Sequence, residues 1–574
     1  MSRSKIKVLF HSNHSKILTG FGKNMKNILL ELYKNNDDIE VFEAANGAKM
    51  GVDLMTPWKS YGTFPSDKNL LQEIENNGAK KQAASYGFYC IDEIIEKVKP
   101  DIYIGIEDIW AFRQFETKPW WRKTKKIIWT TLDSVPMLDQ TLKTYSECDQ
   151  MLVWASFAEK EMKRLGCENV KTLHGAVDYS HFYKLENRKD IRSKFGITDE
   201  FVIGFVFKNQ LRKSVPNLLE GFKRFKESYP ESKAKLLLHT DWESNHKTWD
   251  IAKYIKEKKI DPKDVLCTYI CDNCGKYFVS PYKGEEVECK LCGSQKSSKT
   301  KTTTSPVSEE DLNEIYNLMD VYCHPFTSGG QELPIQEAKS AGLITLVTNY
   351  SCGEDSCHPN QGGLPLSWNE YREPNTHFVK ASTDPESIYK NLKKVFHMTP
   401  EEKQKYIKRG KKNIKDNFSV ESTITKLKKI IIDLNNKKTF FKKTEETKTE
   451  EEKKTVTIDS LLGNEGAKNR LLIVIPESAG DVLMVNSLLG NVKEMYPEKN
   501  IYISTKPEYK PMIDDNPFVY KIIPYSQKFD NLHFLEGKGA NNGYFEIAFL
   551  PHLLTQRLHA YHHNGSDKIQ FFTE

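Results

Sequence analysis

Short apolar runs alternate with amphipathic stretches along the first 435 or so residues of this 574-residue chain. The alternation is typical of βαβ units, in which helices join parallel strands and cover the sheet. Each of the two sets of strands that it predicts is enough for one doubly wound, Rossmann-like sheet. The strands are Ile6–Phe10, Ile102–Ile106, Lys126–Thr130 and Met151–Trp154, then Val202–Phe207, Ala234–His239, Val321–His324 and Ile344–Thr348. Because the stretch around Val177–Asp190 is polar, we expect one domain over residues 1–180 and a second over 181–435.

The chain changes character twice beyond residue 435. Residues 436–467 are highly charged and of low complexity, which predicts a solvated linker. A helix is the alternative there, because Glu and Lys are good helix formers. The strand pattern restarts at Leu471–Ile475 and predicts a further α/β module over residues 468–574.

The composition excludes some classes of protein. No run of roughly 18 apolar residues occurs, so we expect no membrane span, and the apolar part of Met1–Phe10 is too short for a signal peptide. Eleven cysteines without such a signal favour a reducing compartment, and we therefore expect a cytoplasmic protein. The formal net charge of +6 permits an anionic ligand, such as a nucleoside diphosphate or a nucleic acid, without requiring one.

Four of the cysteines have the spacing of a metal site. Cys271 and Cys274 form one pair, Cys289 and Cys292 form a second, and a glycine follows each pair. Four thiolates at this spacing suit a tetrahedral Zn²⁺ and leave no open coordination position, so the zinc is expected to be structural. Cys267 lies off the pattern. We expect a zinc ribbon over residues 267–307, inserted so that neither sheet draws its core from it. Nucleic-acid or protein binding and a purely stabilising role are both open for this ribbon.

Two loops after predicted first strands are suited to an anionic ligand. Gly20 and Gly22 follow the first strand of the chain, where a glycine-rich turn lets backbone N–H groups approach a phosphate or sugar. Lys208, Arg212 and Lys213 follow the first strand of the second sheet and could neutralise a diphosphate from an exposed position in a cleft. An ordinary βα turn and a solvated basic loop are the alternatives.

A third loop joins a strand to a helix in the second sheet. Gly329 and Gly330 precede a helix that begins near Pro334 and carries Glu337 in its first turn. A carboxylate placed there could hold ribose hydroxyls while backbone amides hold a phosphate. The alternative is an ordinary glutamate that the helix dipole favours.

These three loops, in this order, resemble glycosyltransferase family four, a large family of retaining enzymes of the GT-B type. The resemblance covers about residues 5–434 and includes Ser156 and the run Leu173–Asp178, which is similar to the family's interdomain hinge. It implies an α/β fold of two Rossmann-like domains and a nucleotide-sugar donor. It also implies a phosphate-binding pair spanning Lys208 to Lys213, and Glu337 on the donor ribose. No catalytic metal is expected, because electrostatic support of the leaving diphosphate carries the reaction.

The sequence departs from the family pattern at two places. Gly329 replaces the first glutamate of the family's paired-glutamate motif, and we expect Glu332 nearby to compensate as a donor-binding residue. Asp133 follows the strand Lys126–Thr130, near where many members have a histidine beside the reacting sugar. We therefore predict catalytic roles for Asp133, Lys213 and Glu337, with Asp133 on the acceptor side.

The last module resembles the start of the heptosyltransferase-like glycosyltransferases, family nine. A strand, a Gly-Asp turn and an amphipathic helix span Leu471–Pro497, and Asp481 matches the aspartate that acts near the acceptor hydroxyl in that family. Only about the first third of such an enzyme is present. The resemblance therefore implies that Asp481 recognises an acceptor rather than acting as an independent catalyst.

Together these patterns predict a retaining glycosyltransferase that moves a sugar from a nucleotide-diphosphate sugar to a hydroxyl group. A glycan, a lipid-linked glycan, a protein or a modified DNA base could carry that hydroxyl. The alternative is a non-catalytic scaffold that binds a sugar nucleotide or a nucleic acid, which Gly329 and the short third module favour.

Overall fold

The chain folds into two compact units, Met1–Thr439 and Phe440–Glu574, which are described separately. The computed structural model describes residues 5–17, 19–35, 38–176, 178–242, 245, 247–300, 307–436, 462, 469–476, 479–526, 529, 535–536 and 543–551. Apart from residues 436 and 462, the predicted linker lies outside these ranges.

A seven-stranded parallel sheet forms the first half of the larger unit, in the order β3-β2-β1-β4-β5-β6-β7. Its strands are β1 (Ile6–Asn13), β2 (Ile39–Lys49), β3 (Lys59–Phe64), β4 (Ile102–Ile106), β5 (Lys125–Thr130), β6 (Gln150–Val153) and β7 (Val170–Thr172). Its helices are α1 (Gly20–Lys34), α2 (Lys68–Glu75), α3 (Gly78–Ser85), α4 (Ile91–Val98), α5 (Pro119–Lys123), α6 (Asp139–Glu147) and α7 (Ser156–Arg164). The four strands predicted for this region are confirmed.

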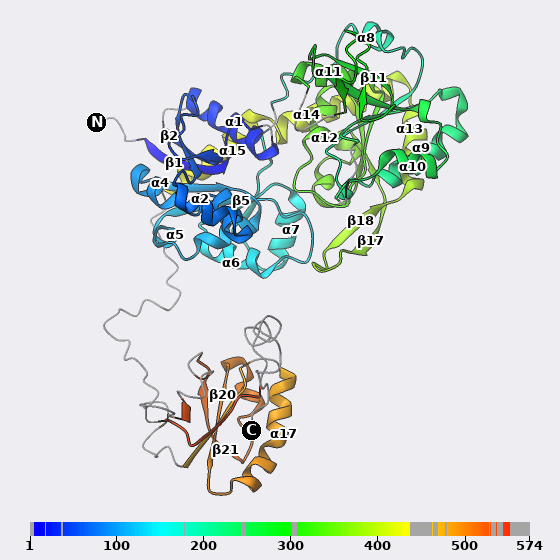
Figure 1. Ribbon diagram of the computed structural model, residues 1–574. Helices are drawn as coiled ribbons and strands as arrows, with labels where there is room; N and C mark the ends of the chain where they lie inside the picture. Colours follow the sequence, from blue (N-terminus) through cyan, green and yellow to red (C-terminus); the bar gives the residue numbers. More distant parts are fainter. Residues whose placement is uncertain are drawn as a thin grey trace. The chain divides into compact units, whose positions relative to one another are not determined.

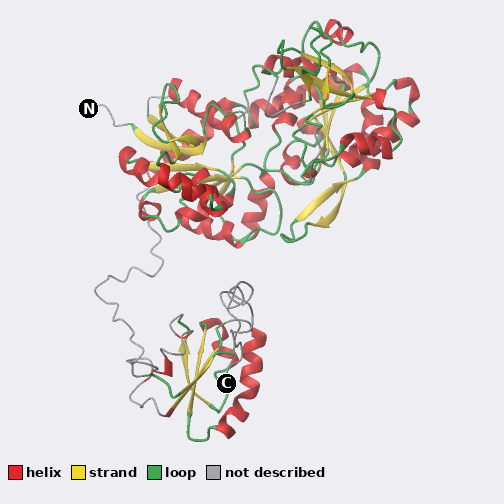
Figure 2. Ribbon diagram, viewed as in Figure 1, coloured by secondary structure: helices red, strands yellow, loops and turns green. Residues whose placement is uncertain are grey.

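Helices cover both faces of the first sheet (Figures 1 and 2). One hydrophobic cluster joins β1, β4 and β5 to α1 and to α15 (Val420–Asn436), whose Leu427 and Ile431 are fully buried. A second cluster joins the same sheet to α4, α5 and α7. The helix α15 therefore returns from the far end of the unit to complete the core of the first sheet.

A nine-stranded sheet forms the second half of the larger unit, in the order β12-β13-β10-β9-β8-β14-β15-β16, with β11 paired to β10. Its strands are β8 (Val202–Val206), β9 (Lys235–His239), β10 (Val265–Cys271), β11 (Tyr277–Pro281), β12 (Glu286–Val287), β13 (Ser298–Lys299), β14 (Val321–His324), β15 (Ile344–Thr348) and β16 (Gly363–Leu366). The helices are α8 (Arg188–Lys194), α9 (Val215–Ser228), α10 (Ile251–Glu257), α11 (Glu309–Leu318), α12 (Leu333–Ser340), α13 (Pro385–His397) and α14 (Pro400–Asn417), and β17 (Trp368–Arg372) pairs with β18 (Val379–Thr383).

The strands of the predicted ribbon are continuous with this second sheet. Strand β10 pairs with β9 over Val265–Cys267 and continues into antiparallel pairing with β11 and β13. Tyr269, Phe278 and Cys289 belong to the hydrophobic cluster that fills the second sheet. The expectation that neither sheet draws its core from this segment is therefore wrong, because the strand that leads into the cysteine pairs is itself a sheet strand.

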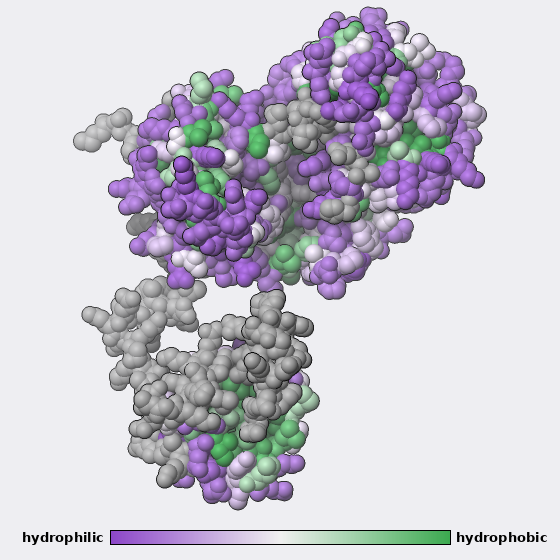
Figure 3. All heavy atoms as spheres, in the orientation of Figure 1, coloured by the Kyte–Doolittle hydropathy of each residue, from purple (hydrophilic) through white to green (hydrophobic). Residues whose placement is uncertain are grey.

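The smaller unit contains a four-stranded parallel sheet in the order β21-β20-β19-β22. Its elements are β19 (Arg470–Val474), α17 (Ala479–Met495), β20 (Asn500–Thr505), β21 (Val519–Pro524) and β22 (Ile547–Phe549). Helix α17 buries Val482 and Leu489, yet Met484 and Leu488 on another side are 62% and 54% exposed. Hydrophobic atoms accordingly gather on the surface of this unit (Figure 3).

Among the helices that the structure describes, none combines the length and the apolar character that crossing a bilayer requires.

Candidate functional site

The strand order of the second sheet reverses direction between β8 and β14. Ligands of open α/β folds bind at such a reversal, beyond the carboxyl ends of the strands, because the two connections leave on opposite sides of the sheet. Arg212 and Lys213 lie in a short 3-10 turn (Leu211–Lys213) shortly after β8, and the backbone N–H of Thr327 after β14 donates to the carbonyl of Arg212 at 2.8 Å. The two predicted loops of this sheet therefore meet at the reversal point.

Glu332, between β14 and α12, contacts both cations. One carboxylate oxygen accepts from the Arg212 guanidinium and the other from the Lys213 ammonium. The Lys213 side chain is only 3% exposed, so the prediction of an exposed lysine is wrong. Burial lowers the pKa of Lys213, and Glu332 opposes that shift. Arg212 accompanies Lys213 at the reversal point through their shared contact with Glu332, whereas Lys208, also predicted to bind the donor, is exposed.

The Gly329–Gly330 loop lies directly against the first sheet. A Cβ on Gly330 would lie 2.5 Å from the Cβ of Thr131, so only glycine permits this approach. Ser328 Oγ donates to Asp133 Oδ2 at 3.3 Å, and Lys380 Nζ lies 3.9 Å from Asp133 Oδ1. Asp133 thus lies at the carboxyl end of the first sheet and beside the loop that follows β14 of the second.

Glu337 lies in α12 behind the same loop. The residue is 6% exposed, and its carboxylate accepts a hydrogen bond from the hydroxyl of Tyr316 at 2.7 Å. Burial raises the pKa of this carboxyl, whereas the charge of Lys23 on α1 and the Tyr316 hydroxyl act in the opposite direction. Glu337 is therefore a buried hydrogen-bond acceptor on a helix that packs on the second sheet. Lys23, on a helix that packs on the first sheet, acts to lower its pKa.

The first predicted loop also faces this region. Gly20 and Gly22 form the first turn of α1, and the Thr19 hydroxyl accepts from the N–H of Gly22 at 3.1 Å, capping the helix. A Cβ on Gly20 would lie 4.0 Å from Leu333 at the start of α12. The turns that precede α1 and α12 are therefore neighbours, as a ligand shared between the two sheets requires.

Three polar residues that the sequence analysis did not single out belong to the same region. Asp108 follows β4 and accepts from the Thr131 hydroxyl; burial raises its pKa, and the charges of Asp133 and Arg212 also act on it. Glu107 beside it is 5% exposed, and burial raises its pKa to about 8. Lys380 on β18 donates to the hydroxyls of Ser134 and Ser328, both at 2.8 Å.

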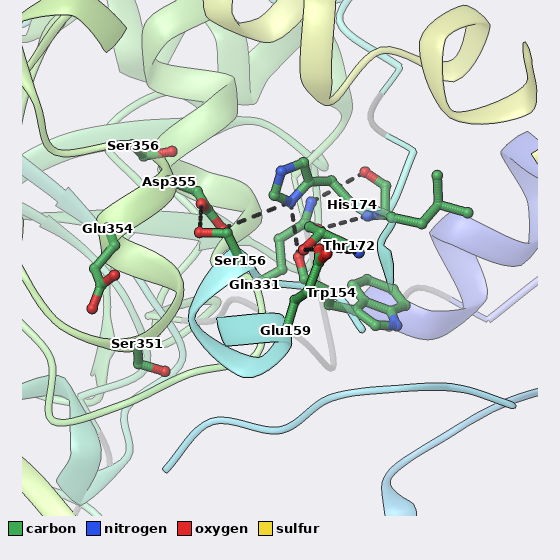
Figure 4. A network of polar contacts seen from close by, with 12 residues as sticks. Trp154, Ser156, Glu159, Thr172, His174, Gln331, Ser351, Glu354, Asp355 and Ser356 are labelled. Carbon is green, nitrogen blue, oxygen red and sulfur yellow. Dashed lines mark hydrogen bonds and ion pairs between the residues drawn. The ribbon is translucent and has the colours of Figure 1, made fainter. Parts of the chain in front are cut away.

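A polar network joins the two sheets beside this site (Figure 4). The side chain of Gln331 accepts from the backbone N–H of Gly175 at 2.7 Å and donates to the carbonyl of the same residue at 3.1 Å. Asp355 accepts from the backbone N–H of Ser156 at 2.9 Å and lies 3.9 Å from the imidazole of His174. The predicted hinge residues therefore contact the loop that carries Glu332.

The described cavities do not coincide with this region. One of about 560 Å³ lies between α13 and α14 and is lined by lysines such as Lys393 and Lys405 together with Arg409. None of the predicted site residues lines it.

The four predicted cysteines come together. Their sulfur atoms all lie within 4.8 Å of one another, so they could hold a metal ion. The backbone N–H of Cys274 donates to Cys271 Sγ, and that of Leu291 donates to Cys289 Sγ, both at 3.4 Å. Gly275 and Gly293 have φ of 70° and 73°, the left-handed region that favours glycine. Cys267 lies elsewhere and donates to the carbonyl of Ser280.

Asp481, the candidate of the smaller unit, lies in the first turn of α17, just beyond the carboxyl end of β19. That unit also reverses its strand order at β19, since β20 lies on one side of it and β22 on the other.

The sequence matches no protein-family model and no curated protein. Among solved structures, sucrose-phosphate synthase from Thermosynechococcus elongatus superposes with a TM-score of 0.50 at 12% identity, covering 75% of this chain and 99% of that one. A glycosyltransferase from Rickettsia africae gives a TM-score of 0.50 at 12% identity over 76% and 100% of the two chains. HepE from Anabaena, solved in complex with UDP, gives 0.50 at 11% identity over 75% and 100%.

These neighbours are GT-B glycosyltransferases. The chain therefore shares the GT-B fold, and it also contains a four-cysteine cluster and a further α/β unit. At this level of identity the comparison concerns the fold, and the chemistry has to be argued from the site.

Proposed function

We propose that the chain is a retaining glycosyltransferase that transfers a sugar from a nucleotide-diphosphate sugar to a hydroxyl acceptor. The observation that carries the proposal is the pair Arg212 and Lys213, placed at the strand reversal of the second sheet and within reach of the loop that contacts Asp133. A cation pair at this position suits a diphosphate, and a carboxylate from the opposite sheet suits the reacting sugar and its acceptor.

The residues divide the chemistry between the two sheets. Arg212, Lys213 and the backbone of the Gly329–Gly330 loop bind the diphosphate and stabilise the charge that develops as the bond between the anomeric carbon and the phosphate oxygen breaks. Glu337 accepts hydrogen bonds from the donor ribose. Asp133 accepts a hydrogen bond from the acceptor hydroxyl, whose oxygen bonds to the anomeric carbon on the face that the diphosphate leaves. The acceptor proton passes to the leaving phosphate oxygen.

The cysteine cluster fits a structural zinc ion. Cys271, Cys274, Cys289 and Cys292 supply four thiolates, and N–H groups directed at two of the sulfurs stabilise their charge. Bound zinc would link the two cysteine pairs and hold β10–β13 together without taking part in transfer. A nucleic-acid partner for this segment, an acceptor role for Asp481 and a cytoplasmic location stay as predictions.

A panel of sugar nucleotides tests the function. Release of a nucleoside diphosphate from one of them, with retention at the anomeric carbon of the product, is the expected result. Failure of every donor, with nucleotide binding intact, would favour the second candidate, a non-catalytic scaffold that binds sugar nucleotides. The observation that favours this candidate is Glu332, which already engages both cations.

A further inference from the structure

Glu332 contacts both cations that are proposed to bind the diphosphate. Its two oxygens take one cation each, Arg212 and Lys213, and Oε2 also lies 3.4 Å from Nε2 of His324. The carboxylate is only 6% exposed. Although burial opposes it, the charges of Arg212 and Lys213 hold the pKa of Glu332 well below its ordinary range. Glu332 is thus an ionised internal anion at neutral pH.

The charge balance of the cluster changes with this anion. Arg212 and Lys213 carry two positive charges and Glu332 removes one, so a dianionic diphosphate meets a site of reduced positive potential. Each contact to a cation is a charge-assisted hydrogen bond, and a phosphate oxygen needs the same donors. Donor binding therefore competes with the Glu332 contacts at Arg212 and Lys213.

Gly329 makes room for this arrangement. A Cβ at position 329 would lie 2.7 Å from Oε1 of Glu332, so any larger residue there displaces the carboxylate. The loop is fixed on its other side, because Gln331 is bonded twice to Gly175 and Ser351 Oγ donates to the carbonyl of Gly329 at 2.8 Å. Gly329, one of the two departures from the family pattern, and the position of the Glu332 carboxylate are therefore structurally linked.

We propose that Glu332 competes with the donor diphosphate for Arg212 and Lys213 and so weakens nucleotide binding. The inference rests on the proposed function, because it takes these two cations to be the diphosphate site. Glu332 would then oppose binding of the sugar nucleotide, whereas the sequence pattern predicts that it contributes to that binding.

Calorimetric titration with UDP, GDP and ADP tests the proposal, with the matching nucleosides as ligands that lack the phosphates. For the nucleotide that wild type binds, Glu332→Gln should raise the affinity about tenfold or more, since about 1.4 kcal/mol of competing interaction corresponds to a factor of ten. Affinity for the nucleoside should not change. Gly329→Ala should also tighten nucleotide binding, because it displaces the carboxylate without removing it. An unchanged or weaker affinity of Glu332→Gln for the nucleotide would overturn the proposal.

Glu220→Gln is the matched control. Its carboxylate also bridges an arginine and a lysine, Arg224 at 3.0 Å and Lys258 at 3.1 Å, but it lies on α9 and takes no part in the site. The control should leave nucleotide affinity at the wild-type value. If wild type and both site variants bind none of the nucleotides, the proposed function itself fails and the inference falls with it. Binding by wild type that Glu332→Gln does not strengthen contradicts the inference alone.

Discussion

Asp355 of the second sheet caps a helix of the first: its carboxylate accepts from the backbone N–H of Ser156, the first residue of α7, at 2.9 Å. The Ser156 hydroxyl donates to the other oxygen of the same carboxylate. A carboxylate at a helix N-terminus accepts a hydrogen bond from a backbone N–H that has no partner within the helix. Its negative charge also interacts favourably with the positive end of the helix dipole. Here the capping carboxylate belongs to the half of the larger unit that holds the second sheet, and the capped helix belongs to the half that holds the first. The contact therefore also fixes how the two sheets meet.

Asp355→Ala should lower the stability of the larger unit by about 1 kcal/mol, which is typical for the loss of a cap, and should reduce transfer by loosening the contact between the sheets. Thermal unfolding and donor turnover measure the two effects. The neighbouring Glu354→Ala removes a partly exposed ion pair with Lys160, which also joins the two halves of the larger unit, and should cost less, because such pairs contribute little. Equal effects of the two variants would contradict the capping role.

Lys213→Ala should reduce turnover about 100-fold, because about 3 kcal/mol of transition-state stabilisation is typical for one such contact. It should also destabilise the protein, because Glu332 then keeps only Arg212 as a charged partner from this pair, and breaking a buried pair costs roughly 3 kcal/mol. The double variant Lys213→Ala/Glu332→Gln should recover much of the stability without recovering turnover. Near-normal transfer by Lys213→Ala would refute the diphosphate assignment.

Purified protein should contain one zinc ion per chain, as measured by elemental analysis without chelators. Cys289→Ser should abolish it and lower the thermal midpoint of the larger unit as a whole, because Cys289 and the strands β10 and β11 belong to the core of the second sheet. Cys267→Ser is the control, since Cys267 is buried on β10, the strand that ends at the ligand Cys271, but lies outside the cluster. The control should keep its zinc; metal loss in Cys267→Ser, or zinc retained by Cys289→Ser, would contradict the site.

Glu107→Gln should change how stability depends on pH. Burial raises the pKa of Glu107 from 4.5 to about 8, so the folded protein binds this proton more tightly than the unfolded chain does. The stability that the proton contributes is full below pH 4.5 and is lost as the pH rises through about 8, by at most about 1.4 kcal/mol per pH unit. The thermal midpoint of the variant relative to wild type should therefore rise between pH 5 and pH 9. Parallel profiles would contradict the shift.

The sequence predicts the strands well because each is a short apolar run, and β4, β14 and β15 have the predicted bounds. The cysteine cluster follows from local spacing and was also predictable. The sequence does not predict the burial of Lys213, since that burial depends on contact with Glu332, 119 residues away. Asp108 follows the predicted strand Ile102–Ile106, and this position at a strand end could have identified it as a candidate site residue. Lys380 carries no such signal, because the serines that surround it come from distant loops.

Removal of the smaller unit tests what that unit adds. The cut should follow residue 439 and not precede the end of α15, because Leu434 is buried in the core of the first sheet and Lys125 Nζ donates to the carbonyls of Leu434 and Asn435, both at 3.1 Å. All the residues proposed to bind the donor, from Gly20 to Glu337, lie in Met1–Thr439. The shortened chain should therefore bind its sugar nucleotide with unchanged affinity and hydrolyse it slowly.

Transfer to the physiological acceptor is where the shortened chain should differ. The smaller unit offers Asp481 at the reversal of its own sheet but, within its described residues, no second sheet that could enclose a nucleotide. If it recognises the acceptor, its loss raises the acceptor KM and leaves kcat unchanged, because the reacting groups stay in the larger unit. Asp481→Asn in the full chain should then reproduce part of the KM increase. A fall in kcat would place Asp481 at the reacting hydroxyl instead, and unchanged acceptor kinetics in the shortened chain would show that the unit has no part in transfer.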